Sequence, residues 1–264
     1  MNKIEITSVT TGSYRTSEAF KTLRTNLQFS GPDIKCIAIT SCLQNEGKSL
    51  ISVELAKSLS EIGKKVIVID TDMRKSVLTL RYKVESSSPL GLSQYLTNQA
   101  TLEDIIFETQ YPNLKMILAG KYPPNPVELL YTDKFKELLA KCREEYDYII
   151  VDTTPLGAVI DAAVIAQRCD GAIMVISAGK IKYRIAANVK KQLEKANCQI
   201  LGAILNYTDS GRFSSKGEKY TYYYKRTPSK HRLGFLNSKN EAADKKEAGV
   251  KTEAADKTEE KAEG

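Results

Sequence analysis

The chain has 264 residues, of which 42% are hydrophobic, and its formal net charge is +7. This length suits one sizeable α/β core with extensions better than two full domains. No apolar run approaches the roughly 18 residues that cross a bilayer, and the N-terminus lacks a signal-peptide core, so we expect a cytoplasmic protein. The five cysteines are scattered without metal-ligand spacing, which indicates reduced core residues.

Strands and helices alternate along most of the chain. Apolar residues at helical spacing predict helices over Thr16–Gln28 and Lys48–Ile62. Another helix is expected to begin at Pro126, with Asn125 as its N-cap and Glu128 reaching back. Six Val- and Ile-rich runs predict buried strands: Ile37–Thr40, Lys65–Ile69, Leu114–Leu118, Tyr148–Val151, Ala172–Ile176 and Gln199–Leu205. Such strands are typical of a mostly parallel sheet with helices on both faces, an α/β fold.

The pattern changes after Asn206, and the rest of the chain divides by charge into two segments. Residues 207–238 are polar, tyrosine-rich and carry a net charge of +5, whereas residues 239–264 are low-complexity and carry −2. Neither segment can bury enough apolar surface to fold alone, so we predict a folded domain over 1–206 and a disordered tail. The folded part keeps about +4, which demands no broad basic face, and we expect no nucleic-acid partner.

A phosphate-binding loop is the most informative motif. Residues 42–49 follow the first of the six predicted strands and end in Gly-Lys-Ser, although a cysteine stands where such loops usually have their first glycine. In this arrangement backbone N–H groups face phosphate, the lysine adds charge, and the serine hydroxyl can bind Mg²⁺. We therefore expect ATP or GTP to bind through Asn45, Glu46, Gly47, Lys48, Ser49 and Leu50. The alternative is a coincidental loop.

Three carboxylates follow two further predicted strands. Asp70 and Asp72 come directly after the strand that ends at Ile69, and Asp152 comes directly after the strand that ends at Val151. Residues two apart on an extended segment point the same way, so Asp70 and Asp72 can serve one site. Asp152 is placed to hold Mg²⁺ through water. The alternative for a single aspartate is a solvated turn or a helix cap.

Taken in order, these motifs resemble the cytoplasmic kinase domain of bacterial tyrosine kinases (BY-kinases), encoded with capsule and exopolysaccharide genes. Residues 70–74 match the second Walker motif of that family (D-x-D-x-R), and residues 149–153 match its Walker B motif. Residues 124–130 match its P-N-P-x-E-L-L stretch, and the whole resemblance covers about residues 8–226. The resemblance implies a P-loop NTPase-like fold and an ATP-dependent protein-tyrosine kinase.

The resemblance also implies roles for individual residues. Lys48, Asp70, Asp72 and Asp152 would be catalytic, with Asp70 or Asp72 as the base that takes the tyrosine proton. Mg²⁺ would be held by Ser49, Asp72 and Asp152. Arg74 and Asn206 would contact the nucleotide, the latter at adenine.

Further expectations concern assembly and regulation. A helix with Glu18, Lys21 and Arg24 resembles the contact helix of a homo-oligomeric ring. The family's C-terminal tyrosine cluster, phosphorylated in trans, corresponds to Tyr220, Tyr222, Tyr223 and Tyr224. The family further implies a transmembrane activator (a chain-length-determinant protein) that recruits the kinase to the inner face of the cell membrane. A cognate tyrosine phosphatase would reverse the modification.

The chain departs from the family pattern at a few positions. Gln44-Asn45 replaces Pro-Gly, which is a mild change because asparagine tolerates left-handed backbone angles. Lys21 replaces an arginine and weakens bidentate pairing between subunits, and Thr154 replaces a proline. The repetitive segment after residue 238 is outside the family pattern.

Two other functions stay open at this point. The first is a partitioning or septum-placing ATPase switch, although such proteins usually carry a second lysine near the start of the loop, where Ser41-Cys42-Leu43 has none. The second is a non-catalytic adaptor that binds nucleotide, which only an activity measurement would separate from a kinase. The tyrosine-rich segment could also be a passive tail or could bind anionic lipid or polymer.

Overall fold

The structure is a computed structural model that describes residues 2–6, 14–84 and 89–208. Its strands are β1 (Asn2–Glu5), β2 (Cys36–Ser41), β3 (Val66–Asp70), β4 (Lys83–Val84), β5 (Ile106–Thr109), β6 (Leu114–Ile117), β7 (Tyr148–Asp152), β8 (Gly171–Ser177) and β9 (Ile200–Asn206). Its helices are α1 (Tyr14–Phe29), α2 (Lys48–Ser60), α3 (Leu78–Arg81), α4 (Leu92–Leu96), α5 (Leu102–Ile105), α6 (Pro126–Tyr131), α7 (Asp133–Glu145), α8 (Asp161–Ala166) and α9 (Tyr183–Lys195). Apart from residues 207 and 208, the two tail segments lie outside the described residues, as do the four candidate acceptor tyrosines.

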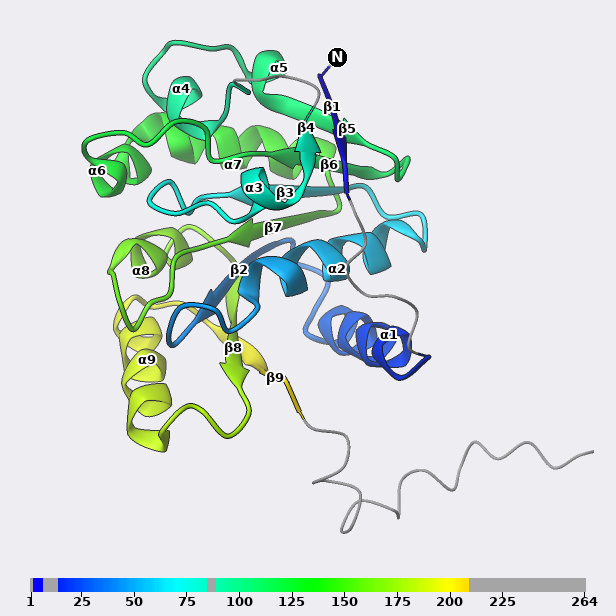
Figure 1. Cartoon of the computed structure of the whole chain (residues 1–264), viewed down its shortest axis with the longest axis vertical. Helices are drawn as coiled ribbons and strands as arrows, with labels where there is room; N and C mark the ends of the chain where they lie inside the picture. Colours follow the sequence, from blue (N-terminus) through cyan, green and yellow to red (C-terminus); the bar gives the residue numbers. More distant parts are fainter. Residues whose placement is uncertain (1, 7–13, 85–88, 209–264) are drawn as a thin grey trace, which may run out of the picture. The chain divides into compact units, whose positions relative to one another are not determined.

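Within the described residues the strands form one nine-stranded sheet in the order β4-β1-β5-β6-β3-β7-β2-β8-β9 (Figure 1). The six strands predicted from sequence are neighbours in the sheet, in the order β6-β3-β7-β2-β8-β9. Each of them runs parallel to its neighbours within this group. In the part of the chain that the structure describes, antiparallel pairing joins only β5 to β6 and β1 to β4. The prediction of a mostly parallel α/β sheet is confirmed.

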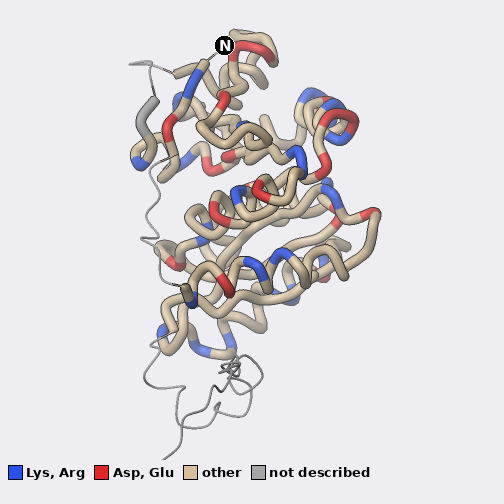
Figure 2. Tube along the Cα trace, turned by 90° about the vertical axis from the view of Figure 1, so that its right-hand side faces the viewer, with Lys and Arg blue, Asp and Glu red and all other residues tan. Residues whose placement is uncertain are grey.

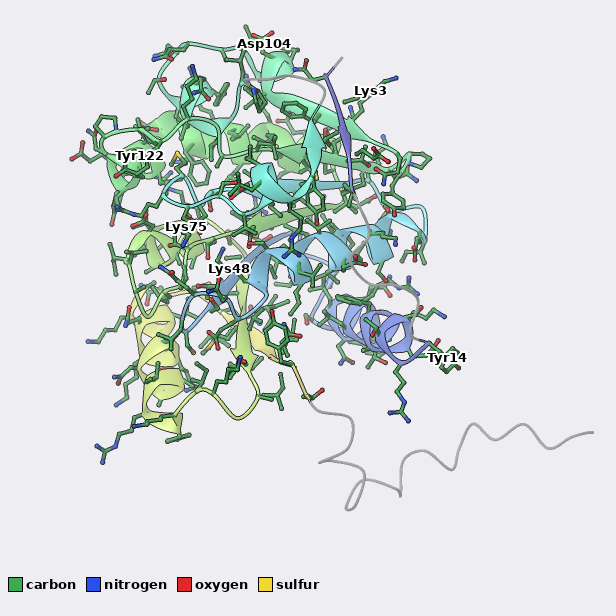
Figure 3. All side chains as sticks on the ribbon, in the orientation of Figure 1. Lys3, Tyr14, Lys48, Lys75, Asp104 and Tyr122 are labelled. Carbon is green, nitrogen blue, oxygen red and sulfur yellow. The ribbon has the colours of Figure 1, made fainter. Side chains whose placement is uncertain are left out.

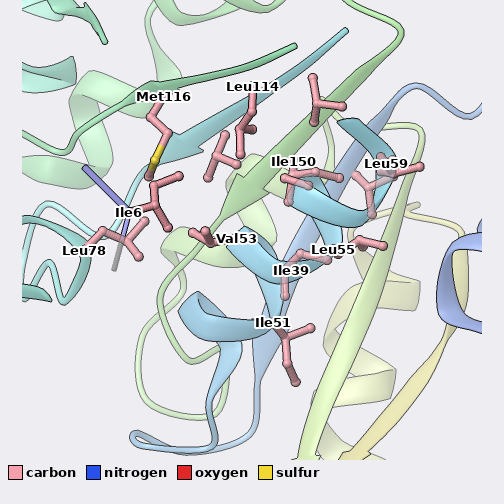
Figure 4. Packing of buried hydrophobic residues seen from close by; sticks show 14 of the residues in the cluster. Ile6, Ile39, Ile51, Val53, Leu55, Leu59, Leu78, Leu114, Met116 and Ile150 are labelled. Atoms are coloured by element: carbon pink, nitrogen blue, oxygen red, sulfur yellow. The ribbon is translucent and has the colours of Figure 1, made fainter. Parts of the chain in front are cut away.

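Alternation along the central strands sends side chains to both faces of the sheet. In β3, Val66 and Val68 join a cluster with α2, whereas Ile67 and Ile69 join a cluster with α7. Figure 4 shows the first cluster, where Leu55 and Leu59 of α2 lie with the residues of the strands. Because each such side chain stabilises the fold by about 1.5–3 kcal/mol when fully buried, both helical layers are needed to cover the sheet.

The start of α6 agrees with the sequence prediction, except for the role of the N-cap side chain. The helix predicted to start at Pro126 does so, with Asn125 at the N-cap. The Asn125 side chain makes no cap, however, because its amide donates to the carboxylate of Glu128 instead.

Charge and hydropathy add two observations. Basic and acidic side chains are mixed over the described part of the chain (Figure 2). None of the helices in the described ranges is long and apolar enough to cross a membrane.

Candidate active site

The loop between β2 and α2 turns through two left-handed residues. Asn45 has a φ of 62° and Gly47, the N-cap of α2, has a φ of 88°. Glycine adopts this conformation freely and asparagine tolerates it, so Asn45 supplies the turn that a glycine would otherwise make. No side chain caps α2, so the first N–H groups of this 13-residue helix are available to an anion.

Glu46 and Asn206 hold this loop in place. The Glu46 carboxylate is buried and accepts hydrogen bonds from the backbone N–H of Leu43 (2.7 Å) and of Ser177 (2.8 Å). Asn206, the last residue of β9, donates from Nδ2 to the Glu46 carbonyl oxygen at 2.9 Å. The loop is thus tied to the ends of β8 and β9, and the Glu46 carboxylate is engaged within the protein.

Lys48 points toward the carboxylates at the ends of β3 and β7. Its Nζ lies 3.3 Å from Asp72 Oδ2 and 3.8 Å from Asp152 Oδ1. The Ser49 hydroxyl oxygen lies 3.2 Å from the same Nζ. Asp70 is the direct neighbour of Asp152 in the pairing of β3 with β7. The structure therefore brings together all four residues predicted to be catalytic.

The two aspartates of the D-x-D-x-R motif have different surroundings. Asp70 is fully buried, and its oxygens accept from the Asp72 N–H (3.0 Å) and the Ser76 hydroxyl (2.6 Å). Asp72 lines an open pocket together with Lys48, and Asp70 does not. The expectation of a shared orientation is corrected here, because the chain leaves the extended form after β3 and Met73 N–H donates to the Thr71 carbonyl oxygen. Of the two aspartates, Asp72 is the one that faces the open pocket.

Burial decides the protonation of this cluster. Burial, reinforced by the charge of Asp152, raises the pKa of Asp70 to about 7. Burial also raises the pKa of Asp152, against the opposing effect of Lys48. For Lys48, burial disfavours the charged form, but the carboxylates of Asp152, Asp72 and Asp70 outweigh it and raise the pKa. The surrounding carboxylates therefore favour the charged form of Lys48, while burial favours the protonated form of Asp70.

Replacing Asp70 by asparagine is expected to stabilise the protein at high pH. Because the folded-state pKa of about 7 lies above the ordinary value of 3.8, the stability associated with Asp70 is present at low pH and lost as the pH rises through 7. The asparagine side chain keeps an acceptor oxygen but never carries charge. We expect urea unfolding to show a gain of roughly 2–4 kcal/mol at pH 8, shrinking below about 1 kcal/mol near pH 4.5.

Asp33→Asn provides the matched control for this measurement, because Asp33 is exposed. Its effect on unfolding should be small at both pH values. A loss of stability in Asp70→Asn at pH 8 would contradict the assignment of a destabilised carboxylate.

The two carboxylate oxygens of Asp152 differ in their hydrogen bonding. Its Oδ1 accepts from the Ser52 hydroxyl at 3.2 Å, while Oδ2 is buried and has no hydrogen-bond partner among the described residues. A buried carboxylate oxygen without a protein partner is unfavourable unless an ion or a water binds it. With the Ser49 hydroxyl and Asp72 nearby, the set consists of the oxygen donors that Mg²⁺ prefers.

The pocket beside Lys48 has one charged wall and one apolar wall. The apolar wall is formed by Val77, Pro155, Ala158 and Val159. Arg74 lines the charged wall, where its Nε and Nη2 donate to the buried Asp161 carboxylate at 2.8 and 3.3 Å. Lys75, also on that wall, is exposed and lies near Lys48 (Figure 3). The pocket can therefore take an anion beside an aromatic or aliphatic group.

Helix α1 carries the residues predicted to contact another subunit. Lys21 donates to Glu18 at 2.8 Å within the same helix. Arg24 donates to the Ser58 carbonyl oxygen (2.8 Å) and hydroxyl oxygen (3.2 Å) of α2. Arg24 is thus engaged inside the subunit, whereas the Glu18–Lys21 pair lies on the partly exposed outer face.

Comparisons with known proteins agree with this geometry. The family model described as an AAA domain matches residues 34–197. Tyrosine-protein kinase CpsD of Streptococcus agalactiae is 42% identical over 213 residues, which cover 78% of this chain and 93% of CpsD. The chain belongs to the bacterial tyrosine-protein kinase family.

Solved structures give the same result. The kinase domain of the Escherichia coli tyrosine kinase ETK matches 83% of this chain and 80% of its own chain, with a TM-score of 0.69 and 30% identity. The septum site-determining protein MinD of Pyrococcus horikoshii, complexed with Mg-ADP, matches 65% of this chain and 70% of its own, with a TM-score of 0.55 and 27% identity. The P-loop NTPase-like fold is confirmed, and a kinase of this family uses a nucleotide.

Sequence reasoning missed two residues of the site. Ser52 lies one turn after Lys48 in α2, and its hydroxyl donates a hydrogen bond to Asp152. Asp161, at the start of α8, accepts a hydrogen bond from Arg74. The i, i+4 spacing of Ser52 from Lys48 on a predicted helix could have indicated the first. No motif in the sequence marks Asp161.

Proposed function

We propose that this chain is an ATP-dependent protein-tyrosine autokinase that regulates capsular or extracellular polysaccharide synthesis and export. The observation that carries the proposal is the pocket in which Lys48 and Asp72 meet an apolar wall. That pocket joins a phosphate-binding loop to a surface suited to the ring of an acceptor tyrosine. The tyrosine-kinase names of the relatives support the same reaction.

Each residue of the site has a role in phosphoryl transfer. The loop backbone from Asn45 to Leu50 binds the phosphates, and Lys48 neutralises charge on the transferred γ-phosphoryl group. A tyrosine hydroxyl, with a pKa of about 10, is a poor nucleophile at neutral pH and needs a positioned base. Asp72 accepts its proton as the tyrosine oxygen bonds to the γ-phosphorus and the bond to the ADP oxygen breaks. Ser49, Asp72 and Asp152 would hold Mg²⁺, which would supply further charge neutralisation.

The proposed acceptors are Tyr220, Tyr222, Tyr223 and Tyr224 of a neighbouring subunit. They belong to the segment over 207–238 with a net charge of +5. Each phosphate adds about −1.5 to −2, so four phosphates more than reverse that charge. Phosphorylation would then switch the attachment of the tail to anionic surfaces.

Regulation is proposed to follow the family pattern. The outer face of α1, with Glu18 and Lys21, would form the contacts of a homo-oligomeric ring. A transmembrane activator would bind the kinase at the inner face of the cell membrane, and a cognate phosphatase would remove the phosphate. The head-to-tail contact of a closed ring places the tail of one subunit at the site of the next.

Phosphopeptide mapping of the full chain after incubation with ATP and Mg²⁺ tests this function. We expect phosphate on the Tyr220–Tyr224 peptide, and more of it when the cytoplasmic end of the activator is added. A variant with these four tyrosines changed to phenylalanine should lose that phosphate while still binding ATP. If ATP binds or is hydrolysed but no tyrosine phosphate forms in any condition, the chain is an ATPase switch or an adaptor.

A further inference from the structure

Helix α9 and the turn before it hold the excess positive charge of the folded domain. Residues 178–199 contain six basic residues and one glutamate, a net charge of +5. Residues 1–206 together carry about +4, so the remainder of the domain is close to neutral. Helix α9 lies at the outside of the domain, next to β8 and β9 (Figure 1). The charge is thus gathered on one surface element.

The sequence of α9 places basic side chains on its outer face. Val189 and Leu193 are buried in a cluster with residues of β8 and α8. Arg184, Lys191 and Lys195 are separated by seven and four residues, so they project from a common face of the helix. All three are exposed. The inner face of α9 therefore belongs to the core, and the outer face is a row of positive charge.

No carboxylate of the described residues compensates this row. Arg184, Lys191 and Lys195 form no ion pair in the part of the chain that the structure covers. The single glutamate of the helix, Glu194, pairs with Lys190 instead. Like charges so close together repel each other, and an anionic surface placed against them would relieve that repulsion.

The row continues toward the start of the basic tail. Lys180 and Lys182 precede α9 and are exposed, and Lys182 is its N-cap residue. Lys180 Nζ lies 5.7 Å from the centre of the Tyr207 ring. Tyr207 is the first residue of the segment over 207–238, whose net charge is +5. The positive charge of α9 and the beginning of that segment are therefore neighbours.

We propose that the α9 surface, formed by Lys180, Lys182, Arg184, Lys191 and Lys195, binds the anionic phospholipid headgroups of a membrane. The inference goes beyond the kinase reaction and does not depend on it. Near an anionic bilayer each basic side chain strengthens binding by about five-fold.

Two features favour lipid over nucleic acid as the anionic partner. Tyr183, in the first turn of α9, is 85% exposed, and tyrosine is enriched at membrane–water interfaces because its ring is amphipathic. Four of the five basic residues of the α9 surface are lysines, whereas nucleic-acid recognition favours the planar guanidinium group of arginine. A lysine stem can also lie along an apolar surface while its ammonium group contacts phosphate.

Vesicle flotation with the full chain tests the inference. We expect binding to vesicles that contain phosphatidylglycerol, weakened by added salt, and none to vesicles of phosphatidylcholine alone. The triple variant Arg184→Gln, Lys191→Gln, Lys195→Gln should bind the anionic vesicles about 100-fold more weakly. Glutamine is a good helix former, so α9 should remain folded.

A matched triple variant separates the α9 surface from net charge. Lys65→Gln, Lys136→Gln and Lys141→Gln remove the same charge from exposed positions before β3 and on α7. This variant should bind within about three-fold of the unaltered chain, because the attraction falls off within a Debye length of the membrane. The tail is identical in both triple variants, so the difference between them reports on α9.

A single tryptophan shows which face meets the lipid, because the chain contains none. In the full-length Tyr183→Trp variant we expect anionic vesicles to shift the emission to shorter wavelength. Tyr131→Trp, at the end of α6 and 55% exposed, is the control and should not respond. An unchanged emission of bound Tyr183→Trp would place another face at the membrane and overturn the inference.

Two further results would overturn it. The first is equal binding of the two triple variants to anionic vesicles. The second is binding of double-stranded DNA through the α9 surface without binding of the vesicles, which would make this face a nucleic-acid site. None of these measurements requires ATP, so a chain that binds vesicles through α9 but phosphorylates no tyrosine would refute the proposed function alone.

Discussion

A Lys48→Met variant is expected to phosphorylate tyrosine at least about 10³-fold more slowly than the unaltered chain. The ammonium group of Lys48 is the positive charge nearest to Asp72 and Asp152, at 3.3 and 3.8 Å. Without it, the site loses the cation that directly offsets the negative charge that the carboxylates and a triphosphate bring together. Methionine fills the space of the lysine stem, so the loss reports on charge. Quantitative phosphopeptide mapping of the tail measures it.

The same variant should also lose stability, and the pH dependence of that loss is the stronger test. Removing one partner of a buried ion pair costs about 3 kcal/mol, because the remaining charge has no partner. Without Lys48 the folded-state pKa values of Asp70 and Asp152 rise further above their ordinary value. The variant therefore loses stability as the pH rises, and its deficit should be larger at pH 8 than at pH 5.

Lys115→Met is a suitable control for that measurement, because Lys115 is partly exposed and pairs only weakly with Glu145, at 3.7 Å. Its effect should be small and nearly independent of pH. A pH-independent deficit in Lys48→Met would mean that Lys48 does not stabilise the carboxylates.

The sheet could be predicted from sequence because its central strands are nearly all apolar. Strands such as Val66–Asp70 and Gly171–Ser177 are buried on both faces, so their composition alone marks them. The edge strands could not be found in this way. Asn2–Glu5 is only four residues long and buries a single side chain, Ile4, so it leaves no apolar run.

Site residues could be predicted from sequence where a local motif sets their position. They could not be predicted where tertiary packing sets it. Lys48 and Asp152 follow directly from a loop and a strand end. Asp161 holds Arg74 across 87 residues of sequence, and only the packing of α8 brings the two together. The turn after Asp70 depends on tertiary contacts as well, since Thr71 donates both its N–H (2.9 Å) and its hydroxyl (2.6 Å) to the Asp152 carbonyl oxygen. Sequence spacing therefore left the choice between Asp70 and Asp72 open, and the pocket favours Asp72, which lines it.

If Asp72 is the base, its replacement should have a large effect on the reaction. We expect Asp72→Asn to lower kcat about 10²- to 10⁴-fold. In the unaltered chain the Lys75 N–H donates to Asp72 Oδ1 at 3.0 Å, and the asparagine side chain keeps an oxygen that can accept this bond. Asparagine cannot, however, take the proton of the acceptor tyrosine. ATP binding, measured by calorimetry, should stay within a few-fold, because the loop supplies most phosphate contacts.

Asp70→Asn is the matched comparison, since it makes the same substitution of aspartate by asparagine two residues earlier in the same motif. The Asp70 side chain is fully buried and already accepts from Asp72 N–H and Ser76, so we expect it to affect the reaction only by positioning the turn that carries Asp72. We expect a loss in kcat of about ten-fold, well below that of Asp72→Asn. If Asp70→Asn is instead the more damaging of the two, the base is Asp70, and the closed turn seen here must open before phosphoryl transfer.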